Sequence, residues 1–231
     1  MSGIRPEGFR PETITCPDNL IITATYSFED LRRKARDITL LDNVVAGFHP
    51  YRLSLITLEE VPLDQLHPCS LYVLESQLEI TRQLRDAFLK QGVDPLRMTS
   101  DKALIEYRWD DFTHCVISPP IVEVSEDDGG ILVLVDGLHR VWIARELGWD
   151  SVIVTKIENI ACPLQPLPTR WDEISVFETV PPEAQKKRFR FNSPDEIRRW
   201  MLENHDRFIQ GFDFPEKLSW MHYQEPLRIT S

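Results

Sequence analysis

The sequence has few cysteines, and no two of them are spaced to hold a metal ion. Cys16, Cys69, Cys115 and Cys162 lie far apart, and none belongs to a Cys-x-x-Cys motif. This spacing argues against a zinc site or a disulfide framework and predicts reduced thiols. No apolar run approaches the about 20 residues that a membrane span requires. The first residues contain no apolar stretch typical of a signal peptide, so we expect a cytoplasmic protein with no membrane partner.

Positive charge is also scarce. The chain has 26 Lys and Arg against 37 Asp and Glu, which gives a net charge of −11. Proteins that bind duplex DNA usually carry a positive excess, because the release of counterions from phosphates drives their binding. The charge therefore argues against nucleic acid as a partner. In other respects the chain is ordinary: it has 231 residues, 42% of them hydrophobic, which suffices for a buried core.

Hydrophobic periodicity and turn residues predict a mixed α/β fold. Helices are expected after a capping box at Ser27, from about Ser76 to Gln91, and from Leu138 to Gly148. Strands are expected over residues 51–61, 121–124, 131–135 and 151–157, with an Asp-Gly-Gly hairpin turn between the second and the third. This order of elements indicates a mixed sheet with flanking helices. Residues 94–116 are expected to form an insertion or long loop, with a short helix near Asp101–Trp109.

We expect three parts along the chain. Residues 1–56 form an N-terminal extension with one helix, residues 57–160 a compact core, and residues 169–231 a mainly helical appendage with a helix from Ser193 to Gly211. In the appendage, the basic run Lys186–Phe191 has two interpretations. It is either a contact for a phosphate or nucleic acid, or an exposed strand whose two phenylalanines point inward.

The segment most informative about chemistry is Val135–Ala144. Here an apolar strand leads through an Asp-Gly turn onto the first turn of a helix. The free N–H groups of that turn and the helix dipole favour an anion. His139 and Arg140 add side-chain donors, and a guanidinium binds phosphate with two hydrogen bonds. Gly137 allows a ligand to approach the backbone closely.

Asp136 is the unusual member of this group. A carboxylate beside a phosphate is unfavourable unless it binds a cation or accepts a proton from a hydroxyl group. The combination of Asp136, His139 and Arg140 at a helix N-terminus therefore suggests Mg²⁺-assisted phosphoryl chemistry. The alternative is that Asp136 only caps the helix, since Asp-Gly turns before helices are common.

Residues 57–158 resemble the ParB/sulfiredoxin superfamily. The resemblance rests on segments in that family's order: Leu63–Pro68, the helix ending at Gly92, Ser118–Val122, and Asp136–Arg140 continuing to Gly148. It implies a compact α/β fold that binds nucleotide phosphates at the turn Gly137, Leu138, His139 and Arg140.

Three branches of this superfamily differ at that turn. Sulfiredoxins have a catalytic cysteine where this chain has Leu138, so sulfinic acid reduction is not expected. Partitioning ParB proteins have Gly-Glu-Arg-Arg and a following helix-turn-helix, neither of which is recognisable in this chain. Free serine kinases have Asp-Gly-His-His-Arg, which differs from this sequence only at Leu138. Those kinases also use a glutamate ahead of the long helix, for which Glu75 is the candidate; equally, Glu75 is a first-turn acid that the helix dipole favours.

The resemblance to the kinase branch implies a Mg²⁺-dependent phosphotransferase or nucleotide hydrolase using ATP, ADP or CTP and a small hydroxylated acceptor. Asp136 would bind Mg²⁺ or orient the acceptor, His139 would stabilise the transferred phosphoryl group, and Glu75 would act as base. Two alternatives stay open: a noncatalytic nucleotide-sensing module that binds a partner protein, and a ParB-like nuclease or DNA-binding protein. Trp142 and Trp149 either stack on a base or pack in the core. A homo-oligomer is compatible with all of these.

Overall fold

The computed structural model describes residues 20–38, 49–108, 114–161, 166–182, 185 and 187–190. The helix expected from Ser193 to Gly211 lies outside these residues. The helices are α1 (Phe28–Asp37), α2 (Glu75–Lys90) and α3 (Leu138–Glu146), with 3₁₀ turns η1 (Leu63–Gln65), η2 (Glu126–Asp128) and η3 (Trp171–Glu173). The strands are β1 (Ile21–Tyr26), β2 (Leu55–Pro62), β3 (Leu66–Pro68), β4 (Tyr72–Leu74), β5 (Leu104–Arg108), β6 (His114–Ile117), β7 (Ile121–Ser125), β8 (Ile131–Asp136), β9 (Ser151–Glu158) and β10 (Ser175–Phe177).

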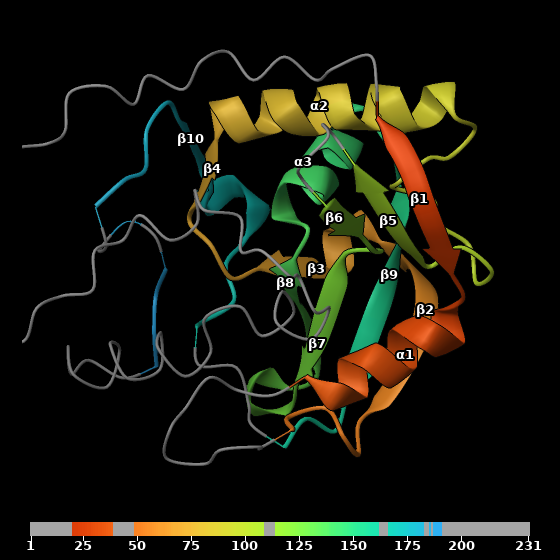
Figure 1. Cartoon of the computed structure of the whole chain (residues 1–231). Helices are drawn as coiled ribbons and strands as arrows, with labels where there is room; N and C mark the ends of the chain where they lie inside the picture. Colours follow the sequence, from red (N-terminus) through yellow and green to blue (C-terminus); the bar gives the residue numbers. More distant parts are fainter. Residues whose placement is uncertain are drawn as a thin grey trace, which may run out of the picture.

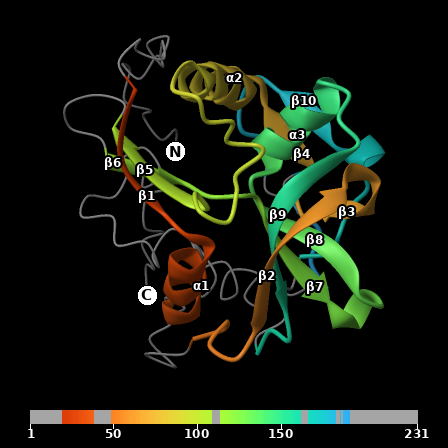
Figure 2. The same cartoon turned by 90° about the vertical axis from the view of Figure 1, so that its right-hand side faces the viewer.

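Two main sheets organise these elements. A five-stranded mixed sheet has the order β2-β9-β7-β8-β3, and a three-stranded antiparallel sheet has the order β1-β5-β6. Strands β4 and β10 form a separate parallel pair. Figure 2 shows the two main sheets on opposite sides of the molecule, with α2 at one end and α1 at the other. The expected mixed α/β class is confirmed.

Both faces of the five-stranded sheet are covered, which explains the apolar sequence of its inner strands. On one face, Val122, Leu134 and Val154 pack with Val141 and Ala144 of α3. On the other face, Ile121 and Ile157 pack with Leu31 and Ala35 of α1.

Helix α2 connects the two sheets along the upper edge of the molecule (Figure 1). Near its start, Leu78 belongs to the hydrophobic cluster of the five-stranded sheet. Near its end, Phe88 packs with Ile105 and Tyr107 of the three-stranded sheet. None of the helices in the described part of the chain has the length and apolar character needed to cross a membrane.

Local sequence signals predicted the three helices and strands β2, β7, β8 and β9, but not the other strands of the described chain. Ser27 and Asp30 form a reciprocal capping box at the start of α1. Strands β7 and β8 form the expected hairpin, with Gly129 in the left-handed region at its turn. Helix α2 begins and ends within a residue of the expected bounds.

The expected loop with a short helix near Asp101–Trp109 is wrong. Residues Leu104–Arg108 form β5, the middle strand of the three-stranded sheet. Leu104, Ile105 and Tyr107 are buried there. Strand β5 pairs on one side with β1, which is distant in the sequence, and on the other side with β6, which follows it. Pairing on both sides, rather than a local periodicity, fixes this segment as a strand.

A buried polar contact stabilises the α1 side of the five-stranded sheet. Tyr51 and Glu123 are both almost fully buried, and the Tyr51 hydroxyl donates to Glu123 Oε1 at 2.5 Å. We expect Tyr51→Phe to lower the free energy of unfolding by about 1–3 kcal/mol, because a buried carboxylate loses a donor. Urea unfolding measures this. Tyr26→Phe removes the same group from a partly exposed pair with Glu106 and is expected to cost less than about 1 kcal/mol. Equal costs at the two sites would contradict the assignment of the effect to burial.

Candidate functional site

The turn between β8 and α3 is built around Gly137. Its φ is +86°, in the left-handed region, and it is the N-cap residue of α3. A Cβ at this position would lie 2.9 Å from Pro120 Cβ and 3.0 Å from the Arg140 guanidinium. Both the backbone angle and the close neighbours therefore require glycine. No side chain caps the helix at this end, so the alternative that Asp136 is a helix cap is wrong.

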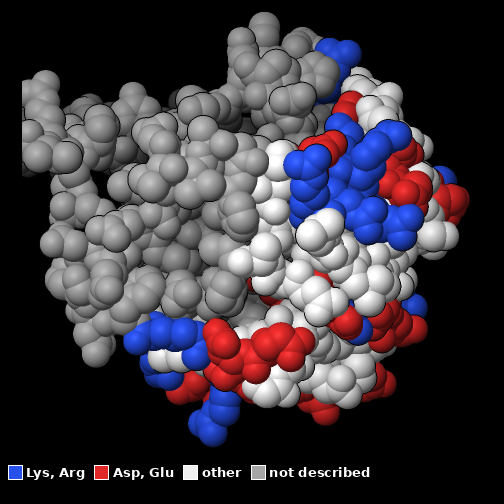
Figure 3. Space-filling model, turned by 90° about the horizontal axis from the view of Figure 1, so that it is seen from below, with Lys and Arg blue, Asp and Glu red and all other residues white. Residues whose placement is uncertain are grey.

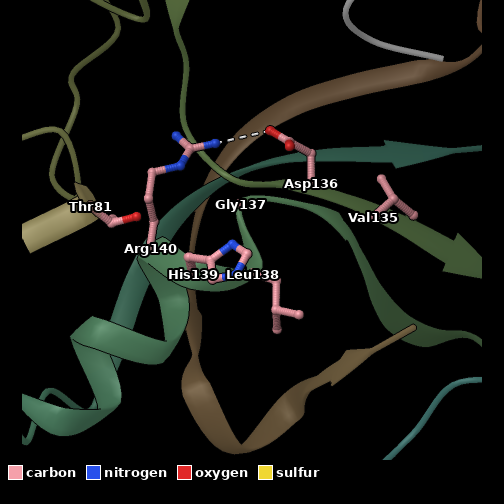
Figure 4. A pocket seen from close by; sticks show the side chains of 7 residues that line it. All are labelled: Thr81, Val135, Asp136, Gly137, Leu138, His139 and Arg140. Atoms are coloured by element: carbon pink, nitrogen blue, oxygen red, sulfur yellow. Dashed lines mark hydrogen bonds and ion pairs between the residues drawn. The ribbon is translucent and has the colours of Figure 1, made fainter. Parts of the chain in front are cut away.

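Arg140 links the turn to the segment that precedes β7 through hydrogen bonds of its side chain. Its guanidinium donates to the carbonyl oxygen of Ser118 and, at 2.9 Å, to Asp136 Oδ2. The Arg140 side chain is only 13% exposed, whereas Asp136 is 49% exposed at the rim. Figure 4 shows this pair on one side of the turn and Leu138 on the other. In this arrangement Arg140 positions the carboxylate of Asp136 and braces the Ser118–Pro120 segment.

His139 connects α3 to the start of α2. The backbone N–H of Leu74 donates to His139 Nε2 at 3.4 Å, so Nε2 carries no proton and the neutral ring has its hydrogen on Nδ1. Burial lowers the pKa of His139; the nearby Asp136 carboxylate acts against this and the Arg140 charge acts with it. His139 is therefore a neutral donor at neutral pH rather than a cation.

These residues surround a pocket of about 270 Å³. It is lined by Val135, Asp136, Gly137, Leu138, His139 and Arg140, with Thr81 of α2 opposite them. The structure thus brings together all of the candidate residues of the Asp136–Arg140 segment. The pocket combines the first turn of α3, a neutral imidazole donor and an exposed carboxylate. The amides and the imidazole suit an anion. The carboxylate suits a hydroxyl group, either on that anion or on a second molecule beside it.

Glu75 lies apart from this pocket wall. It is the exposed first residue of α2, next to the Leu74 amide that binds His139. It is not among the residues that line the pocket. Its place in the first turn fits the interpretation that the helix dipole favours an acid there. Its role as a base stays a prediction.

Two features of the site were not found from the sequence. Thr81 lines the pocket from α2, with its hydroxyl donated to the Gln77 carbonyl at 2.6 Å. Pro120 forms the wall against which Gly137 packs. The Ser118–Val122 segment is part of the resemblance in sequence, and the fold places it against the turn.

A cation at this site would have one carboxylate donor, Asp136, among the residues that line the pocket. No group of three or more His, Cys, Asp and Glu side chains that suits a metal ion occurs among the described residues. Mg²⁺ bound to a nucleotide needs only one or two protein carboxylates, because phosphates and waters supply its other ligands. Asp136 fits that requirement, although its carboxylate is paired with Arg140.

The basic run near residue 188 is occupied by contacts within the chain. Phe189 forms an antiparallel bridge with Pro166. Arg188 pairs with Glu173 at 2.8 Å, and Arg190 pairs with Asp128. The described residues of this run form an isolated bridge rather than the expected strand, and the side chains of both arginines are engaged within the chain. On the face shown in Figure 3, the other concentration of Lys and Arg lies over α1 and is bordered by acidic residues.

The fold and the site define a mixed α/β protein with an anion-suited pocket at the start of a helix. The sequence model of the ParB CE domain matches residues 30–175, and the chain belongs to this family. Comparisons with curated proteins and with solved structures gave no match.

Gly137→Ala tests the packing of the turn. Gly148 also has a positive φ, +71°, but a Cβ there has no neighbour within 4 Å. We expect Gly148→Ala to cost about 1–2 kcal/mol of stability from the backbone angle alone. Gly137→Ala is expected to cost about 2–5 kcal/mol, because the contact with Pro120 adds to that angle. Thermal and urea unfolding measure both. Similar costs for the two variants would show that Pro120 yields without strain.

The neutral state of His139 makes stability depend on pH. Because the pKa of His139 is lowered in the folded protein, the unfolded chain protonates this side chain more readily. The contribution of neutral His139 to the free energy of unfolding is therefore complete above the ordinary histidine pKa of about 6.5, and it is lost as pH falls below that value. The loss is at most about 1.4 kcal/mol for each pH unit crossed. We expect the free energy of unfolding of His139→Gln to depend less on pH between about pH 7 and pH 5 than that of the wild type, as measured by urea unfolding at each pH. His67→Gln in β3 is the control variant. If the free energy of unfolding of His139→Gln changed with pH as steeply as that of the wild type, this prediction would be contradicted.

Proposed function

We propose that this member of the ParB CE domain family binds a nucleotide at the Asp136–Arg140 turn and transfers one of its phosphoryl groups to a small hydroxylated acceptor or to water. The observation that supports this most directly is the start of α3, where no side chain caps the helix and a pocket opens. The first-turn N–H groups and the helix dipole favour a phosphate there. The resemblance to free serine kinases at Asp136, Gly137, His139 and Arg140 points to the same chemistry.

Each residue has a role in this proposal. The amides of Leu138 and His139 hold the phosphates, and the Nδ1–H of neutral His139 donates to the transferred group. Asp136, held by Arg140, accepts the proton of the attacking hydroxyl, whose oxygen bonds to phosphorus while the bond to the bridging oxygen breaks. Mg²⁺, when bound with the nucleotide, supplies positive charge for the phosphate oxygens. Glu75 is the second candidate for the base.

A noncatalytic nucleotide sensor is the second candidate function. The observation in its favour is the ion pair between Asp136 and Arg140, at 2.9 Å. This pair occupies the carboxylate that a transfer reaction requires. In a sensor, the turn binds phosphates while Asp136 stays paired with Arg140 and has only a structural role.

Calorimetric titration of ATP, ADP and CTP, with and without Mg²⁺, tests the proposal. We expect the wild-type protein to bind at least one of them, and His139→Ala to weaken binding about tenfold or more, because a buried donor to phosphate is lost. Asp136→Asn is expected to retain binding and to lower phosphate release or transfer at least about 100-fold.

Three outcomes of this experiment differ in meaning. Binding without turnover in the wild type would favour the sensor. Turnover that survives Asp136→Asn would move the catalytic role to another residue, with Glu75→Gln as the next variant. The absence of binding by all three nucleotides would overturn the proposal.

A further inference from the structure

A second pocket lies further along α3. It has a volume of about 370 Å³ and is lined by Trp142, Arg145 and Glu146 of α3 and by Trp171 and Asp172 of η3. The two indole rings have their centroids 6.4 Å apart and are tilted by 52°. The Arg145 guanidinium lies over the Trp171 ring, 4.6 Å from its centroid. Three flat groups therefore form the wall of this pocket.

The polar edges of both indoles already have partners. Trp142 Nε1–H donates to Glu146 at 3.0 Å, and Trp171 Nε1–H donates to the Leu66 carbonyl at 2.7 Å. These bonds fix the planes of the rings. Both rings are half-buried, so what they leave open is ring surface rather than a hydrogen-bonding group.

The carboxylates at the rim are paired as well. Glu146 binds Arg82 at 2.6 Å, and Asp172 binds Arg170 at 3.0 Å. Arg145 supplies a further positive charge. A cationic ligand therefore has no unpaired carboxylate to meet in this pocket. A flat ring without positive charge is the better match, because it stacks on indole and guanidinium planes.

Both pockets are lined by residues of α3. Leu138 lines the first pocket, and Leu138, Trp142 and Trp171 each pack against the same hydrophobic cluster. Leu138, Trp142 and Arg145 follow the i, i+4, i+7 spacing of one helix face. Trp142 and Arg145 lie four and seven residues after Leu138, which corresponds to about 6 to 10 Å along the helix axis. A sugar between phosphates and base bridges a gap of this order.

We propose that the Trp142–Trp171 pocket binds the base of the nucleotide whose phosphates lie at the start of α3. This inference rests on the proposed function, and it adds the part of the ligand that the first pocket does not recognise. The phosphates are held by the turn and the ring is held by stacking. Stacking on aromatic side chains tolerates different bases, so ring contact rather than hydrogen bonding dominates recognition at this pocket.

The test compares ATP with inorganic tripolyphosphate, which lacks the base and the sugar. Both are titrated with Mg²⁺ into the wild type, Trp142→Leu and Trp171→Leu by calorimetry. Leucine keeps apolar contact with the core but removes the ring. We expect each variant to bind ATP about tenfold more weakly and tripolyphosphate as well as the wild type does. Trp142→Phe, which restores a ring, is expected to recover most of the ATP affinity.

The matched control is Trp149→Leu. The Trp149 ring packs against the same cluster but lies between the guanidinium groups of Arg85 and Arg97, at 5.4 and 4.3 Å. It is expected to bind ATP and tripolyphosphate like the wild type. Arg145→Met provides a variant in an exposed side chain, which does not depend on refolding of the core. It is expected to weaken ATP binding several-fold and to change tripolyphosphate binding less.

The failures of the two proposals are distinguishable. ATP binding that is equal in the wild type, Trp142→Leu and Trp171→Leu would place the base elsewhere and overturn this inference, while the proposed function stands. Equal losses for ATP and tripolyphosphate would show that the tryptophans act on the fold of the first pocket, which also overturns it. Failure of tripolyphosphate and of all three nucleotides, ATP, ADP and CTP, to bind the wild type would overturn the proposed function and this inference with it.

Discussion

The reversal of the chain at Gly137 is the constraint on which the candidate site depends. Strand β8 ends and α3 begins at one residue, with φ at +86° and Pro120 too close for any side chain. Because Arg140 binds both the Ser118 carbonyl and Asp136, the entry to β7 and the end of β8 are held together at the same point. The orientation of the first turn of α3, and with it the direction of its free amides, follows from these contacts.

Helix α2 extends this constraint to the rest of the molecule. Its first turn meets α3 through the Leu74 amide and His139, whereas Phe88 near its end packs on the three-stranded sheet. The pocket therefore lies where the two sheets are joined, with Thr81 as the contribution of α2. A neutral His139 suits this position, because a protonated Nε2 would face another donor. The same ring thus links α3 to the start of α2 and lines the pocket.

The parts of the structure that follow from local chemistry were predictable from the sequence. The Asp136–Gly137 turn, the helix after it and the β7–β8 hairpin each have a signal within a few neighbouring residues. The ParB CE domain model matches residues 30–175, which include residues 57–158, the segment that resembles the ParB/sulfiredoxin superfamily. The strand β5 had no such signal, because its identity depends on pairing with β1. For the same reason, the contact of Pro120 with Gly137 and the position of Thr81 required the tertiary structure.

The negative net charge and an anion site are compatible for a physical reason. Exposed charges more than about 8 Å away are largely screened at cellular ionic strength, so the −11 of the whole chain acts weakly on a small ligand in a pocket. In the proposed complex, a nucleotide would meet mainly the backbone amides, which add nothing to the net charge, and the neutral His139. A long polyanion such as DNA would need positive charge over a wider surface, and Arg188 and Arg190 of the basic run are already paired with Glu173 and Asp128. The net charge of −11 is therefore a stronger argument against a nucleic-acid partner than against the small phosphate ligand that we propose.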